Sequence, residues 1–132
     1  MNQDKIKAAA TALRQARATR VAIPRISEQF GIQGADEAYA VARCNTMLDL
    51  AEGRRVVGKK IGLTSQAVQQ QLGVGQPDYG VLFADMEFLS GSEVPASRLI
   101  QPKAEGEIAF VVGRDLDGES LSWGRFLHGL EY

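Results

Sequence analysis

Two glutamates, Glu105 and Glu107, stand two residues apart in the run EGEIAFVVG, which has the strongest β-strand character in the chain. Alternate residues of a strand point to the same face, so both carboxylates would lie on one face, roughly 6.5–7 Å apart at the backbone. Such a pair repels unless a cation or a proton lies between the carboxylates. Mg²⁺ and Mn²⁺ prefer oxygen ligands and can be bound by carboxylates without histidine or cysteine, so the pair is a candidate metal site. The alternative interpretation, in which both glutamates lie on a solvent-exposed strand face without a ligand, is commoner.

Lys59 and Lys60 lie between two glycines, Gly58 and Gly62, in a second predicted strand. If one face of that strand is buried, one lysine points inward, where it could hold a substrate carboxylate or move a proton. The alternative interpretation is a pair of surface lysines, which is again commoner. Asp78, in the loop sequence GQPDYG, is a further candidate, although an aspartate in such a loop ordinarily forms a turn.

The first half of the chain must position these residues, and it is predicted to be mainly helical. Apolar residues recur at helical spacing in two long segments, and Gly53 ends the second of them. A short third helix begins at a Thr64 or Ser65 cap and ends at Gly73. Cys44, in the second helix, is interpreted as a small apolar residue rather than a nucleophile. The predicted helices cover residues 2–20, 35–52 and 66–72, and the strand with the two lysines covers residues 56–63.

The second half of the chain has β character. A turn is expected at Ser90-Gly91, and another at Asp117-Gly118. Ser120 or Ser122 then caps a final helix. No glycine, proline or polar tail follows Leu130, so the sequence predicts an uncapped helix at the end of the chain. The predicted β segments cover residues 87–89, 92–94 and 105–113.

The composition excludes several classes of protein. The chain has 132 residues, 45% of them hydrophobic and 23% charged, which is typical of a globular domain. Its 15 basic and 16 acidic residues leave a net charge of −1, so no nucleic-acid partner is expected. One cysteine excludes an intrachain disulfide, and one histidine, His128, excludes a multi-histidine metal site within one chain. With neither a signal peptide nor a membrane span in the sequence, the expected location is cytoplasmic.

Two long motifs allow a comparison with known families. The first is GKKIGLTSQAVQQQLGVGQPDYGVLFADM at residues 58–86, and the second is IQPKAEGEIAFVVGRDL at residues 100–116. At this separation they resemble the 2-keto-4-pentenoate (vinylpyruvate) hydratases, members of the fumarylacetoacetate hydrolase-like superfamily that act in meta-cleavage degradation of aromatic compounds. The resemblance covers the whole chain, loosely before Val56 and closely after it.

The resemblance implies a role for each candidate residue. Glu105 and Glu107 match the family's metal-binding carboxylates, with Mg²⁺ or Mn²⁺ as the cation. Lys60 matches the active-site lysine, and Asp78 matches the aspartate of the Q-P-D-[FY]-G motif. The implied reaction adds water to 2-hydroxypenta-2,4-dienoate and gives 4-hydroxy-2-oxopentanoate. The implied partners are a small-molecule 2-hydroxydienoate or 2-oxo acid, further copies of the chain in a homo-oligomer, and neighbouring enzymes of the pathway.

The implied fold is α+β, with a helical region at residues 1–55 beside the first part of a mixed β-roll at residues 56–132. Members of the family are much longer, and their third metal carboxylate lies beyond the helix that begins near Ser122. The chain is therefore expected to be a truncated N-terminal half. Two alternatives stay open: a 4-oxalocrotonate decarboxylase or related superfamily enzyme, and an inactive remnant that acts as an interaction module.

Overall fold

A computed structural model describes residues 2–117 and 120–132. The chain forms two compact units, residues 1–101 and residues 102–132, and the predicted α+β class is confirmed. The predicted division at residue 55/56 concerns the complete fold and stays a prediction. Among the described helices, none combines the length and the hydropathy of a membrane-spanning segment. The elements are α1 (Gln3–Thr19), α2 (Ile26–Phe30), α3 (Gly34–Ala51), β1 (Val56–Gly62), α4 (Gln66–Leu72), β2 (Asp78–Phe83), the 3₁₀ helices η1 (Ala84–Met86) and η2 (Ala96–Arg98), and α5 (Trp123–His128).

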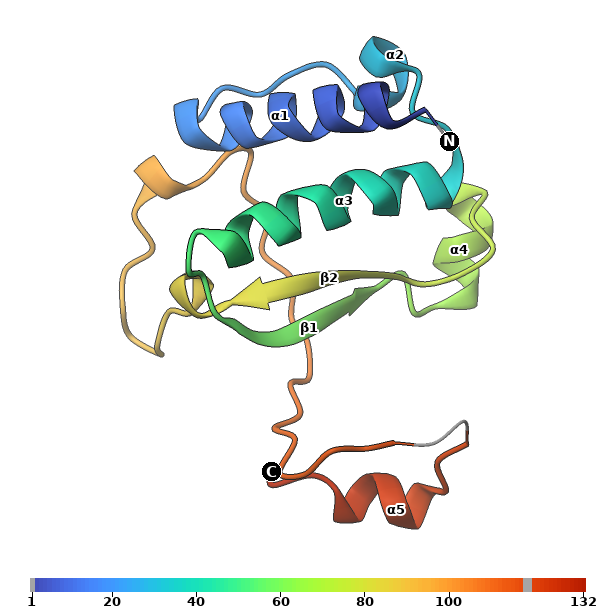
Figure 1. The fold of residues 1–132 in the computed structure, drawn as a ribbon. Helices are drawn as coiled ribbons and strands as arrows, with labels where there is room; N and C mark the ends of the chain where they lie inside the picture. Colours follow the sequence, from blue (N-terminus) through green and yellow to red (C-terminus); the bar gives the residue numbers. More distant parts are fainter. Residues whose placement is uncertain (1, 118–119) are drawn as a thin grey trace. The chain divides into compact units, whose positions relative to one another are not determined.

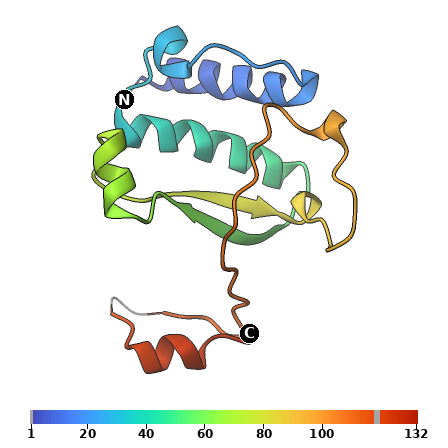
Figure 2. The same ribbon diagram turned by 180° about the vertical axis from the view of Figure 1, so that it is seen from behind.

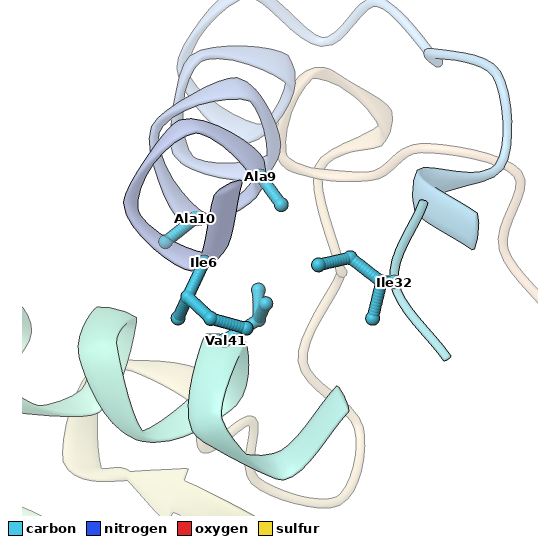
Figure 3. Packing of buried hydrophobic residues seen from close by; sticks show 5 residues of the cluster. All are labelled: Ile6, Ala9, Ala10, Ile32 and Val41. Carbon is cyan, nitrogen blue, oxygen red and sulfur yellow. The ribbon is translucent and has the colours of Figure 1, made fainter. Parts of the chain in front are cut away.

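In the first unit, α3 lies between α1 and the antiparallel ribbon formed by β1 and β2 (Figures 1 and 2). A small apolar cluster joins the two helices, and none of its members is more than 4% exposed. Figure 3 shows this cluster between the helices and the loop that follows α2. Alanine side chains let α1 approach closely, as the alanine-rich sequence of the first helix predicts. The cluster consists of Ile6, Ala9, Ala10, Ile32 and Val41.

The predicted helices and the first strand are confirmed to within two residues at each end, and other features of this unit differ from prediction. A five-residue helix, α2, was not expected, because so short a segment shows no periodicity. Asp78 was expected in a loop and is instead the first residue of β2. Half-buried Cys44 packs against the apolar cluster, which confirms its interpretation as an apolar residue. Ser65 stands at the N-cap of α4, although its side chain makes no capping hydrogen bond.

A buried carboxylate ties α1, α3 and the ribbon together. Asp49, near the end of α3, is 2% exposed and accepts hydrogen bonds from Arg14 (2.9 Å) and Arg17 (3.2 Å) of α1 and from Arg54 (2.8 Å) before β1. Arg54 also donates to both carboxylate oxygens of Asp85 in η1, each at 2.8 Å. Burial alone would raise the pKa of Asp49, but the hydrogen bonds from Arg17 and Arg14 outweigh it and hold this pKa below its ordinary value.

In the second unit, the run at residues 105–113 does not form the predicted strand. Within the described residues it is paired only at its end, through a single bridge between Val112 and Leu130. The Val111 N–H also donates to the Tyr132 carbonyl at 2.8 Å. The prediction of a strand is therefore wrong for the part that carries the two glutamates. An alternating sequence fixes the two faces of a strand, but a strand forms only where a partner supplies the ladder of hydrogen bonds.

The shorter predicted β segments, residues 87–89 and 92–94, are also wrong, since the structure assigns no strand to either of them. The turn between them is confirmed, because the Ser92 N–H donates to the Leu89 carbonyl at 3.0 Å and Gly91 has a φ of 82°. Short strands without a partner are not stable in water, so turn residues alone did not make a hairpin here.

The final helix is present with Ser122, one of the two predicted caps, at its start, and only its C-terminal end differs from the expectation that it is uncapped. The Ser122 side chain caps its start by accepting from the Arg125 N–H at 3.2 Å. Gly129 ends it, and the Gly129 N–H donates to the carbonyls of Arg125 and Phe126 at 3.1 and 3.0 Å. A β-carbon at position 129 would collide with the Leu116 side chain, so a larger residue there would require that side chain to move. The turn expected at Asp117-Gly118 lies partly outside the described residues.

Candidate functional site

The register of β1 and β2 brings two predicted site residues together. Lys60 lies opposite Gly80, and Gly62 lies opposite Asp78. Directly opposed residues share a face, as do alternate residues along one strand, so Lys60 and Asp78 project from the same face of the ribbon. Diagonal neighbours of this kind are about 7–8 Å apart. Both lysines of the pair are exposed, so neither points into a core, and alternation places Lys59 on the opposite face.

Gly62 lets the Asp78 carboxylate lie against the backbone of β1. A β-carbon at position 62 would collide with Asp78 Oδ1. The neighbouring strand glycine, Gly80, has no such contact, because no atom of the described chain lies within 4 Å of the corresponding position. The two glycines therefore differ in function, although both lie in the ribbon beside Lys60.

This difference gives a first prediction. In Gly62→Ala, we expect the short Asp78 side chain to rotate away, because it yields more easily than the backbone of two paired strands. The carboxyl ¹³C resonance of Asp78 should then move. In the matched control, Gly80→Ala, the resonance should stay in place, and the lower chain entropy should stabilise the fold by roughly 0.5–1 kcal/mol. An unchanged Asp78 resonance in Gly62→Ala contradicts the steric role of Gly62.

An open cleft of about 790 Å³ lies between the start of α3 and residues 74–79, within the first unit. Asp78 and Tyr79 line it from β2, and Tyr39 and Ala42 line it from α3. Asp78 thus lines this cleft and also lies on the face of the ribbon that it shares with Lys60.

A pair of tyrosines closes one side of this cleft. The rings of Tyr39 and Tyr79 stack with their centroids 4.7 Å apart and their planes 16° apart. The Tyr79 N–H donates to the Tyr39 hydroxyl oxygen at 3.2 Å. Tyr39 was not among the predicted site residues. It lies beside the apolar side of its helix and not within it, which indicated only that it is not a core residue.

The chain turns sharply where β1 ends, beside the same cleft. Leu63 has a φ of 55°, which is unusual for a residue with a branched side chain. The Gln69 side chain of α4 stabilises this turn, because its Nε2 donates to the Leu63 carbonyl at 2.6 Å. Strained backbone of this kind is often found at functional sites.

The two glutamates lie in the other unit of the chain. Glu105 and Glu107 are exposed and belong to a segment without regular secondary structure. Lys60 and Asp78 share the ribbon of the first unit, and Glu105 and Glu107 share one segment of the second.

The donor set for a metal fits in type and falls short in number. Mg²⁺ prefers oxygen ligands such as carboxylates. The ion takes about six ligands, some of which are water molecules. Among residues 2–117 and 120–132, no group of three or more histidine, cysteine, aspartate and glutamate side chains is arranged to hold a metal ion. The chain thus offers two carboxylates of the right chemistry.

The sequence is similar to several curated bacterial hydratases. It is 51% identical over 126 residues to 2-keto-4-pentenoate hydratase 1 of Dechloromonas aromatica strain RCB. The aligned residues make up 96% of this chain and 48% of that protein. It is 48% identical over 127 residues to the TodF product hydratase of Pseudomonas putida strain F1. The aligned residues make up 96% of this chain and 47% of that protein. No family model matches the chain.

The fold is similar to that of a solved decarboxylase. The 4-oxalocrotonate decarboxylase from Pseudomonas putida G7, complexed with magnesium and adipate, matches with a TM-score of 0.89 and 30% identity over 100% of this chain and 50% of that one. The same enzyme complexed with calcium and acetate also matches with a TM-score of 0.89. The resemblance found in the two sequence motifs is thereby confirmed. Over nearly its whole length the chain is similar to 2-keto-4-pentenoate hydratases, and it spans about half the length of the curated relatives that it matches.

Proposed function

We propose that this chain supplies part of the active site of a divalent-metal-dependent hydratase. The reaction adds water to 2-hydroxypenta-2,4-dienoate and gives 4-hydroxy-2-oxopentanoate. The observation that carries the proposal is the common face of Lys60 and Asp78, in a chain about half identical to hydratases of this class. A cation and a carboxylate on one exposed face can bind an anionic substrate and exchange protons with it.

In the proposed mechanism, Lys60 pairs with the substrate carboxylate or carries a proton between substrate and water. Asp78 orients or activates a group beside it, and the close approach to Gly62 restricts where its carboxylate lies. A divalent cation supplies positive charge where negative charge develops on the substrate oxygens. Loss of the 2-hydroxyl proton and protonation at C5 give the conjugated 2-oxo-3-alkene, and water then adds across this double bond, its hydroxyl to C4 and a proton to C3.

Glu105 and Glu107 are the proposed ligands of the cation, which we expect to be Mg²⁺ or Mn²⁺. The structural neighbour was solved with magnesium and with calcium, which supports a divalent cation. Two carboxylates leave coordination positions for water, for substrate, and for groups outside the described residues.

Metal binding gives the second prediction. Glu107→Gln should weaken binding of Mg²⁺ by at least about tenfold, because an amide keeps one oxygen and loses the negative charge. Isothermal titration with MgCl₂ measures the effect. Glu93→Gln, which removes an exposed glutamate elsewhere in the chain, is the matched control and should bind as the unaltered protein does. Equal affinity in Glu107→Gln and Glu93→Gln would contradict the proposed ligands.

The activity itself is tested on the complete hydratase. We use this term for a chimera in which the chain is followed by the second half of the TodF product hydratase. Loss of the dienoate absorbance with formation of 4-hydroxy-2-oxopentanoate supports the proposal. Release of carbon dioxide from 4-oxalocrotonate, without hydration of the pentadienoate, favours the decarboxylase that the structural match raises as the second candidate.

Self-association is a separate part of the proposal. In the second unit Ile108 is 84% exposed and Trp123 is 80% exposed, and burial of these side chains against a second copy would favour association. We expect the chain to form a homo-oligomer in sedimentation experiments, with a melting temperature that rises with MgCl₂. An aggregated state without a response to Mg²⁺ supports the inactive remnant instead.

A further inference from the structure

The Tyr39–Tyr79 pair connects α3 to the first residues of β2. In the ribbon of the first unit, β2 pairs with β1 along one edge. The Tyr79 N–H points to the other side, where it donates to the Tyr39 hydroxyl at 3.2 Å. The stacked rings, 4.7 Å apart, support the same contact over a larger area. A side chain of α3 thus takes the place that a neighbouring strand would otherwise occupy.

Tyr39 is held by the best-packed part of the unit. It belongs to α3, which is fixed to α1 by the apolar cluster around Val41 and by the ion pairs of Asp49. Side chains of such a helix have few alternative positions. The hydroxyl of Tyr39 is therefore a fixed acceptor, against which the start of β2 is aligned.

The peptide group that donates this hydrogen bond is the one that joins Asp78 to Tyr79. Fixing its plane fixes the backbone ψ angle of Asp78, and with it the direction in which the Asp78 side chain leaves the chain. Gly62, opposite Asp78 in β1, makes room for the same side chain, because a β-carbon there would collide with Asp78 Oδ1. Two contacts from different elements thus determine where the Asp78 carboxylate lies.

We propose that Tyr39 is a positioning residue for Asp78, acting through the hydrogen bond to the Tyr79 N–H and through ring stacking. The inference rests on the proposed function, since it assigns a purpose to the position of Asp78. The effect of Tyr39 is on the geometry of one carboxylate.

The test uses Tyr39→Phe, which keeps the stacked ring and removes the acceptor oxygen, and Tyr39→Leu, which removes both. Tyr132→Phe, at a tyrosine that is 81% exposed, is the matched control. Four quantities are measured. Exchange of the Tyr79 amide hydrogen and the carboxyl ¹³C resonance of Asp78 are measured in the chain itself, and kcat and KM are measured in the complete hydratase.

We expect the Tyr79 amide of Tyr39→Phe to exchange about fivefold faster, as the loss of one hydrogen bond predicts, and the Asp78 resonance to move. We expect kcat to fall at least about tenfold while KM changes less than about threefold, because a displaced group affects the reaction more than binding. Tyr39→Leu should show larger changes in each, and Tyr132→Phe should show none. Because Tyr39→Phe keeps the ring, a failure of Tyr39→Leu to fold leaves the test intact.

Unchanged amide exchange and an unchanged Asp78 resonance in Tyr39→Phe overturn the inference. An unchanged kcat in an active hydratase overturns it as well, because the contact then has no effect on the reaction. If the unaltered complete hydratase is inactive, the proposed function fails. The two measurements on the chain still decide whether Tyr39 positions Asp78.

Discussion

Lys60→Met is expected to lower kcat/KM of the complete hydratase by about 10²–10⁴-fold, the range for losing a group that transfers a proton in the rate-limiting step. Methionine is similar to lysine in length and flexibility, so the substitution removes the charge and the proton with little change in packing. The structure supports the prediction, because Lys60 shares a face of the ribbon with Asp78. Steady-state kinetics with 2-hydroxypentadienoate measure the effect.

The matched control is the adjacent residue. Lys59→Met removes the same charge from the opposite face of β1, and it should leave kcat/KM within about twofold of the unaltered enzyme. Lys60→Arg separates the two roles proposed for Lys60, because arginine keeps the positive charge but does not release a proton at neutral pH. Recovery of activity in Lys60→Arg would indicate carboxylate binding. Wild-type rates in Lys60→Met would remove the residue from the site.

Asp49→Asn is expected to destabilise the first unit by about 3 kcal/mol, because it leaves the guanidinium groups of Arg14, Arg17 and Arg54 without their shared carboxylate. Arg54 keeps its pair with Asp85, but it is the least exposed of the three arginines and loses its hydrogen bond to Asp49. Its side chain is 16% exposed, and its guanidinium lies 4.0 Å above the Phe83 ring. In a unit of this size the melting temperature should fall by more than about 10 °C.

Thermal unfolding followed by circular dichroism measures this loss, with Glu52→Gln as the control. Glu52 also pairs with Arg14, but its side chain is 60% exposed, so its removal should cost less than about 1 kcal/mol. Equal melting temperatures for Asp49→Asn and the unaltered chain would show that the network does not stabilise the fold.

The same carboxylate gives the stability a defined pH dependence. The pKa of Asp49 is lower in the folded chain than its unfolded value of about 3.9. Its contribution is therefore fully present above that value and is lost as the pH falls through the folded pKa. The difference in stability between the unaltered chain and Asp49→Asn should be constant near neutral pH and should shrink below about pH 4.

The features that depend on neighbouring residues could be predicted from the sequence. The long helices follow from apolar spacing, and their ends follow from glycine and capping residues, which act within one turn. The association of Lys60 with Asp78 could be inferred because both belong to one continuous motif. The sequence motifs also indicated the α+β class and the similarity to the hydratases.

Only the tertiary structure decided the contacts between distant residues. Tyr39 and Tyr79 are 40 residues apart, and Asp49 meets Arg14 across 35 residues, and no local pattern specifies either contact. The run at residues 105–113 shows the converse. Its alternating pattern indicates a strand, yet the described chain supplies a partner only near Leu130, so the glutamates lie outside any ladder. A sequence determines which residues can occupy a face, but it is the packing of a second element that decides whether that face forms, because the stabilising free energy comes from the partner.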